Sequence, residues 1–293
     1  VPSLLWESAK DLQLLRRDTA LKRMLEQEVL RIKPDLIYER TNYLQSSGAQ
    51  VARSAGIRYM AEVNAPATER KLLQGPSLFS GLALSRERYI MESAERVVVV
   101  SSALRDHFAE RHGIRLEKFS TIPNAVDPEK FLVQAQDAEI IRKKYSLHGS
   151  PVIGFVGSIF PWHGVDILIE AFSRILSRHS GAKLLVVGDG EVLTALKELA
   201  VRLNVSGSVV FTGNVSPAEA PAHIGVMDIA VMARSNWYGS PVKIFEYGVM
   251  GRAIIAPDVQ PVRDVMEQGK HGILVKPDPA DLAAALLKLL ADD

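Results

Sequence analysis

Cysteine is absent from all 293 residues of the chain. Its absence excludes disulfide bonds, thiolate metal ligands and thiol nucleophiles. It fits a reducing compartment, so we expect a cytoplasmic protein, with work at the inner face of the membrane as a further possibility. No apolar run approaches the roughly 20 residues of a membrane-spanning helix. Charge of one sign is not in excess either, since 35 Lys and Arg stand against 34 Asp and Glu. That balance gives no reason to expect a nucleic-acid partner.

Two blocks of alternating strands and helices make up most of the chain. Continuous apolar strands that are each followed by a helix are typical of parallel sheets covered on both faces. The pattern predicts an α/β protein with two doubly wound domains, over residues 1–135 and 136–293. Ligands in such folds bind at the carboxyl ends of the strands. The predicted strands are 35–38 (buried), 59–63, 96–100, 118–122, 151–156, 183–187, 209–211, 229–232, 253–256 and 273–275. The predicted helices are 3–31, 48–55, 82–94, 103–112, 165–178, 193–203, 218–226, 242–250, 262–268 and 280–290.

The strongest candidate motif opens the helix predicted at 242–250. Ser240 fits an N-cap and Pro241 fits the first helical position. The free N–H groups and the positive dipole end of such a helix attract anions, and Lys243 adds charge where a diphosphate could rest. Glu246, one turn further, could accept hydrogen bonds from two ribose hydroxyls. A capped helix with a surface Lys–Glu pair would use the same residues, and this segment alone favours that plainer interpretation.

Two further loops follow predicted strands. In the first, Gly157 would let a ligand approach the backbone, and Ser158 and His163 could donate hydrogen bonds to an anion. The second loop, at 188–190, places an aspartate between two glycines. Each loop by itself is an ordinary strand-to-helix turn. Neither matches the dinucleotide fingerprint G-x-G-x-x-G or the P-loop pattern, so a nicotinamide dehydrogenase is a distant alternative.

Taken together, these segments resemble the retaining glycosyltransferases of sequence family 4. The resemblance implies the GT-B fold, in which two Rossmann-like domains face a cleft. The similar segments follow the family's order and spacing over nearly the whole chain. They are AERVVVVS at 94–101, IPNAVDPEKF at 122–131, GSIFPWHGVDILIEAF at 157–172, VVGDGE at 186–191, FTGNV at 211–215 and GSPVKIFEYGVMGRAIIAPD at 239–258.

The resemblance also implies roles for individual residues. Glu246 takes the place of the family's ribose-binding glutamate, whereas Tyr238 stands where a first glutamate usually contacts the donor sugar. Ser158 and His163 stand where Arg and Lys usually hold the diphosphate. His163 would be cationic only part of the time near neutral pH, so Lys243 would stabilise more of the leaving group's charge. The expected catalytic residues are Lys243, Glu246 and His163, and the expected donor-binding residues are Gly157, Ser158, Gly188, Asp189, Val215, Tyr238, Gly239, Ser240 and Pro241.

Two residues are expected on the acceptor side. Arg40 ends a strand that would face the cleft, where it could contact a substrate or form a structural salt bridge. Asn64 stands near the place of a histidine in many relatives. An amide cannot act as a base, but Glu62 or Glu69 could lie close to it.

The implied reaction moves a sugar from a nucleotide diphosphate sugar to an acceptor hydroxyl, with retention at the anomeric carbon. The enzyme would be hexosyltransferase-like and would use no metal or other cofactor. A saccharide or a lipid-linked acceptor of cell-surface polysaccharide or glycolipid synthesis is expected, with peripheral association with the membrane. Two alternatives stay open: a nucleotide-sugar 2-epimerase on the same fold, and a non-catalytic subunit that binds sugar nucleotides.

Both ends of the chain look cut relative to the family. Nothing resembles the family's first strand and its Gly-rich loop, and the terminal helices that cross back onto the first domain are not matched. We therefore expect a sheet with an unpaired edge and exposed apolar surface, and weak activity from this chain alone.

Overall fold

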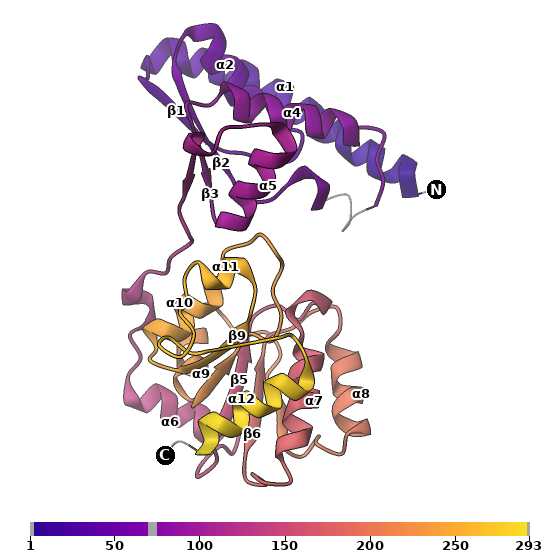
Figure 1. Ribbon diagram of the computed structural model, residues 1–293, viewed down its shortest axis with the longest axis vertical. Coiled ribbons are helices and arrows are strands. Elements are labelled where there is room, and N and C mark those ends of the chain that lie inside the picture. The colour runs from indigo at the N-terminus through magenta and orange to yellow at the C-terminus, as the bar shows by residue number, and fades with distance from the viewer. Residues whose placement is uncertain (1–2, 70–74, 292–293) are drawn as a thin grey trace. The chain divides into compact units, whose positions relative to one another are not determined.

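The computed structural model describes residues 3–69 and 75–291. These residues form two compact units that divide between Pro123 and Asn124, each built on a parallel sheet (Figure 1). The units therefore divide 12 residues before the predicted domain boundary at 135/136. The turn η2 (Pro128–Phe131) contacts helix α10 and helix α6 (Ala135–Lys144) packs on helix α9, so both belong to the second unit.

The first unit has four parallel strands in the order β1-β2-β3-β4. The described strand order does not reverse, and Figure 1 shows the helices of this unit gathered on one side of the sheet. Its strands are β1 (Leu36–Arg40), β2 (Arg58–Val63), β3 (Arg96–Val99) and β4 (Phe119–Thr121). Its helices are α1 (Ser3–Ile32), α2 (Ser47–Ala55), α4 (Ser80–Ser93) and α5 (Ser102–His112), with the short turn η1 (Leu116–Lys118).

Strand β1 is not the buried strand that its apolar residues predict. Among the residues that the structure describes, it lies at the edge of the sheet and pairs with β2 alone. As a result, the side chains of Leu36 and Tyr38 are 38% and 53% exposed. An apolar sequence does not reveal whether a strand has one neighbour or two, which is why the prediction was wrong.

A buried carboxylate joins three helices of the first unit. Asp18 of α1 accepts hydrogen bonds from the backbone N–H groups of Ser46 and Ser47 at the start of α2, at 3.1–3.2 Å. It also forms an ion pair with Arg86 of α4, at 2.8 Å. Asp18 thus caps α2 from another helix, because Ser46 makes no side-chain cap of its own. Ser101, by contrast, caps α5 with its own side chain, by accepting a hydrogen bond from the N–H of Leu104 at 3.1 Å.

The second unit is doubly wound. Its six parallel strands have the order β10-β9-β8-β5-β6-β7, which reverses between β5 and β8. The strands are β5 (Val152–Val156), β6 (Lys183–Val187), β7 (Val209–Phe211), β8 (Ile229–Val231), β9 (Ala253–Pro257) and β10 (Ile273–Val275). The helices are α6, α7 (Val165–Ile175), α8 (Leu193–Arg202), α9 (Ala220–Gly225), α10 (Val242–Val249), α11 (Gln260–Arg263) and α12 (Pro279–Ala291), with the turns η2 and η3 (Pro161–His163).

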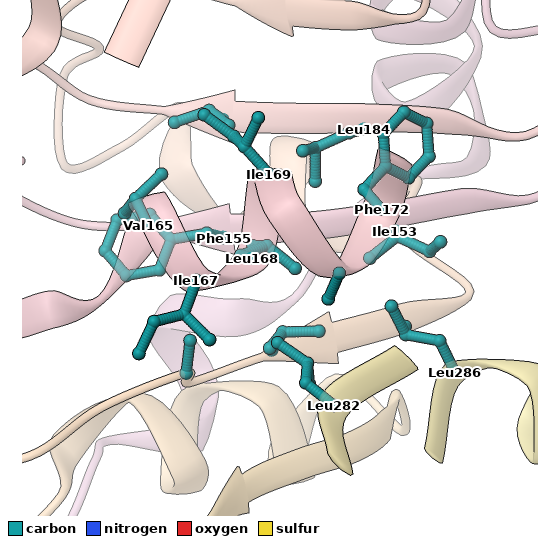
Figure 2. Packing of buried hydrophobic residues seen from close by; sticks show 14 of the residues in the cluster. Ile153, Phe155, Val165, Ile167, Leu168, Ile169, Phe172, Leu184, Leu282 and Leu286 are labelled. Atoms are coloured by element: carbon teal, nitrogen blue, oxygen red, sulfur yellow. The ribbon is translucent and has the colours of Figure 1, made fainter. Parts of the chain in front are cut away.

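Each face of the second sheet has its own hydrophobic core. Side chains alternate along a strand, so Ile153 and Phe155 of β5 face one cluster while Val152 and Val156 face the other. Helices α7, α8 and α12 cover the first face, and α6, α9, α10 and α11 cover the second (Figure 1). Figure 2 shows side chains of α7 packed between β5, β6 and α12. This packing explains why seven of the eleven residues of α7 are buried and apolar.

One predicted helix differs in the structure. The segment 262–268 was expected to be helical, whereas α11 spans only Gln260–Arg263. The chain then turns, and Gln268 forms an isolated bridge with Gly272. Gly272 has a φ of +155°, and a Cβ there would lie 2.4 Å from the carbonyl oxygen of Ile254. The close approach of the turn to β9 therefore ends the helix early.

Shortening a buried side chain of the first core should cause a large loss of stability. Leu168 is fully buried on α7 (Figure 2), so Leu168→Ala should lower the free energy of unfolding by about 2–5 kcal/mol. Leu132→Ala is the matched control, since Leu132 is 79% exposed and its loss should cost less than about 0.5 kcal/mol. Urea denaturation of both variants measures the difference. Equal losses would contradict the assignment of the core.

Candidate functional site

The loops after β5 and β6 continue side by side beyond the strands. The N–H of Gly157 donates to the carbonyl of Val187 at 3.0 Å, and the N–H of Ile159 donates to the carbonyl of Asp189 at 2.9 Å. Gly188 has a φ of +130°, and a Cβ there would lie 2.1 Å from the carbonyl oxygen of Gly157. The glycine is required because two segments of the protein's own backbone meet there.

The sequence predicts that Gly157 leaves room for a ligand, and in the structure the side chain of Lys243 packs against this residue. A Cβ on Gly157 would lie 2.6 Å from Cε of Lys243 and 3.0 Å from its Nζ. Gly157 therefore accommodates a side chain of α10. This contact brings the loop that follows β5 against the motif that opens α10, although Gly157 and Lys243 are 86 residues apart in the sequence.

The start of α10 differs from the predicted cap. The helix begins at Val242, and Pro241, with φ −83° and ψ 82°, is not helical. Ser240 consequently lies too early to cap the helix. Its hydroxyl instead accepts a hydrogen bond from the backbone N–H of Asn124, at 2.9 Å. The prediction of a Ser240 N-cap with Pro241 in the first helical position is wrong, because the proline adopts a turn conformation.

Lys243 and Glu246 do not form the surface pair that was the plainer interpretation. Among the described residues neither side chain makes a hydrogen bond or an ion pair. Burial lowers the pKa of Lys243, opposed by the charge of Glu246, and burial raises the pKa of Glu246, opposed by Lys243. The Lys243 ammonium lies 5.5 Å from the ring centroid of Phe155. Two desolvated charges without close partners on one helix are typical of a ligand-binding site.

The fully buried Tyr247 joins α10 to the end of β5. Its hydroxyl oxygen accepts a hydrogen bond from the N–H of Val156 at 3.1 Å. Strand β8 pairs with β5 only at Ile153 and Gly154, so this N–H lies beyond the ladder. Tyr247 thus supplies the partner that the sheet does not, directly before Gly157. No sequence pattern indicated this role for Tyr247.

A hydrogen bond to the backbone of Ser158 fixes the tautomer of His163. Its Nδ1 lies 2.5 Å from the carbonyl oxygen of Ser158, and a carbonyl can only accept, so Nδ1 bears the hydrogen. Burial lowers the pKa of His163, and so does the charge of Lys243, while the bond to Ser158 opposes the shift. The ring is therefore neutral near pH 7. Because the single hydrogen of the neutral ring is on Nδ1, Nε2 cannot donate. The predicted hydrogen bond from His163 to an anion therefore requires a second proton, on Nε2.

A cavity of about 190 Å³ brings several predicted residues together. His163 and Lys243 line it, and so do Gly239, Ser240 and Pro241. The segment before α10 owes its shape to Asn236, whose side-chain oxygen accepts hydrogen bonds from the N–H groups of Tyr238 and Gly239, at 3.2 and 2.5 Å. The ring of Tyr238 lies edge-on to Trp237, with centroids 5.3 Å apart.

The remaining donor-side residues lie on neighbouring strand ends. Gly188 bridges to Gly213, which brings the segment of Val215 beside it. Val215 is half-buried against the second core. Asp189 is exposed, and its carboxylate accepts a hydrogen bond from the N–H of Gly190 at 2.7 Å. Ser158 is also exposed.

In the first unit Arg40 and Asn64 both contact the carboxylate of Glu62. Glu62 accepts hydrogen bonds from Tyr38 at 2.8 Å and from Asn64 at 2.7 Å, and its carboxylate lies 3.4 Å from Nε of Arg40. Burial opposes ionisation of Glu62, but these three neighbours hold its pKa below the ordinary value. Arg40 therefore forms the salt bridge that was one of its two expected roles. The buried side-chain oxygen of Asn64 has no hydrogen-bond partner in the described part of the chain.

A buried Glu–His pair supports the loop that follows Asn64. Glu87 lies 2.7 Å from Nε2 of His112, and both side chains are more than nine-tenths buried. The second oxygen of Glu87 accepts a hydrogen bond from the N–H of Ala67. His112 is the last residue of α5, and its side chain is buried against Glu87 of α4.

No helix that the structure describes combines the length and apolar character needed to span a bilayer. Within residues 3–69 and 75–291, no group of three or more His, Asp or Glu side chains is arranged to hold a metal ion.

Two family models match the chain in succession. The model described as Glycosyltransferase Family 4 matches residues 3–130, and the model described as Glycosyl transferases group 1 matches residues 150–292. Between them they cover both structural units.

Similar proteins of known name include a GDP-mannose-dependent alpha-(1-6)-phosphatidylinositol monomannoside mannosyltransferase of Mycobacterium tuberculosis. It is 30% identical over 218 residues, which are 72% of this chain and 56% of that protein. The alpha-D-kanosaminyltransferase of Streptomyces kanamyceticus is 26% identical over 250 residues, 83% of this chain and 64% of that protein. The chain thus spans between half and two thirds of the length of these relatives.

Solved structures are similar over nearly the whole chain. Anabaena HepE in complex with UDP superposes with a TM-score of 0.78 at 20% identity, over 93% of this chain and 73% of that one. Sucrose-phosphate synthase from Thermosynechococcus elongatus gives a TM-score of 0.73 at 19% identity, over 95% and 70%. At these identities the likeness concerns the fold alone.

The hydroxyl of Tyr247 provides a test of the link between α10 and β5. Tyr247→Phe leaves the N–H of Val156 buried without a partner, so it should destabilise the protein by about 1–3 kcal/mol. Tyr145→Phe is the control, because the Tyr145 hydroxyl makes no hydrogen bond among the described residues. Its effect should stay within about 0.5 kcal/mol. Chemical denaturation compares the two, and a neutral Tyr247→Phe would contradict the proposed link.

Proposed function

The chain belongs to the group 1 glycosyltransferases with a family 4 amino-terminal domain, and from this premise we propose that it transfers a sugar from a nucleotide diphosphate sugar to an acceptor hydroxyl with retention of anomeric configuration. Its fold is the GT-B fold, with two Rossmann-like parallel-sheet domains. The observation that supports the proposal best is the pair of desolvated charges, Lys243 and Glu246, on the helix beside Gly157.

In this proposal α10 binds the nucleotide. The positive dipole end of α10 attracts the diphosphate, and Lys243 adds a cation at the same place. Glu246 accepts hydrogen bonds from the two ribose hydroxyls, one turn further along the helix. Charge that develops on the departing diphosphate is stabilised by groups already in position. We propose that these groups act without a metal ion or another cofactor.

The other donor contacts come from the neighbouring strand ends. Backbone groups near Gly188 and Val215 would contact the base, while Gly239 and Ser240 would line the sugar and phosphate pocket. These segments follow β6, β7 and β8 at the carboxyl ends of the strands, the edge of the sheet where ligands of this fold class bind. Tyr238 would meet the donor sugar with an aromatic ring instead of a carboxylate.

The first unit would bind the acceptor. We assign Asn64 and Glu62 to the acceptor side, and Glu62 is ionised and held in place by Arg40. The mycobacterial relative is named for a phosphatidylinositol monomannoside acceptor. We propose an acceptor of the same kind, a lipid-linked or polysaccharide saccharide of the cell surface, glycosylated in the cytoplasm at the inner face of the membrane.

Donor binding and transfer test the proposed function. UDP-glucose, GDP-mannose and ADP-glucose should be compared for their effect on the melting temperature, since a donor at a hundred times its Kd adds about 2.7 kcal/mol of stability. The stabilising donor is then incubated with EDTA and a panel of glycolipid and saccharide acceptors. We expect a glycoside whose anomeric configuration, read by NMR, equals that of the donor.

Each alternative has its own outcome in that experiment. A free epimer of the donor sugar would identify a 2-epimerase. Stabilisation by a donor with no transfer to any acceptor would favour the non-catalytic subunit, which the residues Tyr238 and Ser158 keep open. If no sugar nucleotide stabilises the protein, the proposed function is wrong.

Variants of α10 separate binding from stability. Glu246→Gln should weaken donor binding roughly 10–100-fold, because hydrogen bonds to a charged group contribute about 1.5–3 kcal/mol. Lys243→Met should weaken it similarly, yet should keep or raise the melting temperature without donor, since an unpaired desolvated charge is removed. Calorimetric titration and thermal melts measure both effects. The control is Glu198→Gln on α8, which should change neither, and unaltered donor binding in both site variants would refute the assignment.

A further inference from the structure

The donor cavity has fewer permanent cations than a diphosphate demands. A nucleotide diphosphate sugar bears two negative charges on its phosphates and, unlike a free nucleotide, has no phosphate proton that titrates near neutral pH. Lys243 supplies one positive charge to the cavity and the helix end supplies about half of one. The loop after β5 adds only the uncharged Ser158 and the neutral ring of His163.

His163 can correct this deficit in only one way. Its Nδ1–H is already donated to the carbonyl of Ser158. The ring is packed among the rings of Phe155, Phe160 and Trp162, with centroid distances of 5.8, 6.5 and 6.0 Å. Rotation would break the bond to Ser158, so the free position is Nε2, which has no hydrogen-bond partner among the described residues. A proton added there makes the ring a donor toward the cavity that it lines.

We propose that His163 binds the donor diphosphate through Nε2 as an imidazolium, so that the nucleotide sugar and one proton bind together. This inference rests on the proposed function. Nε2 takes a proton from solvent, and the new N–H donates to a phosphate oxygen, with no other bond made or broken. The charge-assisted hydrogen bond replaces the permanent cation that the loop lacks.

The charges around His163 favour uptake only when the diphosphate is present. Lys243 of α10 opposes a second cation in the free protein, and Glu246 lies one turn beyond it. From the segment after β8, the guanidinium of Arg234 donates to the carbonyl of Pro161 at 3.1 Å, and with Asp166 of α7 it lines a different cavity. The bound phosphates would outweigh the repulsion from Lys243 and raise the pKa of the ring.

The sign of the pH dependence follows from this linkage. Below the pKa of the free protein His163 is protonated in both states, so affinity is constant. Between the free and bound pKa values, binding takes up a proton and affinity falls up to tenfold for each unit of rising pH. Above the bound pKa affinity is constant again. The donor should therefore bind more tightly at about pH 6 than at about pH 8.

Isothermal titration calorimetry with UDP-glucose and GDP-mannose tests the proposal. Titrations near pH 7 in buffers of different ionisation enthalpy give the number of protons taken up. We expect uptake approaching one proton for the native chain and none for His163→Gln or His163→Lys. His163→Lys should retain tight binding that no longer depends on pH, because its cation is permanent. His148→Gln, before β5 and outside the cavity, is the control and should behave as the native chain.

NMR of the imidazole nitrogens provides a second measurement that does not depend on the variants. Without donor, the signal of His163 should show hydrogen on Nδ1 only, and saturating UDP-glucose should convert it to the doubly protonated ring at neutral pH. Donor binding that takes up no proton, or uptake that persists in His163→Gln, would overturn this inference and leave the proposed function intact. Failure of every sugar nucleotide to bind at any pH would overturn both.

Discussion

The hydrogen bond from the amide of Val156 to the buried hydroxyl of Tyr247 fixes the candidate site. It joins the last residue of β5 to α10 where β8 no longer pairs with β5. Three further residues of the site pack next to this hydrogen bond. Gly157 follows directly, Lys243 packs against it, and Gly188 packs against its carbonyl. The anion-attracting end of α10 and the loop after β5 are thereby brought to one cavity.

The site holds charged groups in surroundings that disfavour their charge. Lys243 and Glu246 are partly desolvated and have no close partner, and the ring of His163 is neutral because of burial and Lys243. These states cost stability, and the two hydrophobic cores on either side of the sheet offset the cost. A ligand with negative charge and hydroxyl groups would satisfy all three side chains at once, which is the physical basis for assigning a nucleotide sugar to them.

Much of the fold could be predicted from the sequence. Strands β6, β7 and β10 have the predicted bounds, and α12 differs by one residue at each end. Five of the residues expected from the family resemblance line the cavity: His163, Gly239, Ser240, Pro241 and Lys243. The errors concern segments whose conformation depends on distant neighbours. Strand β1 has one partner strand within the described part of the chain, α11 stops where its turn meets β9, and the unit boundary depends on what α6 packs against.

The sequence by itself determined the alternation of strands and helices, the two sheets, and the residue types at each strand end, because these depend on local hydrophobic pattern and spacing. Only the tertiary structure decided which groups have partners. Ser240 bonds to Asn124 rather than capping its helix, and Asp18 caps a helix 28 residues away. His163 loses its charge to burial and to Lys243, 80 residues distant. Hydrogen bonds and pKa values depend on distance and desolvation in space, and neither quantity can be calculated until the chain has folded.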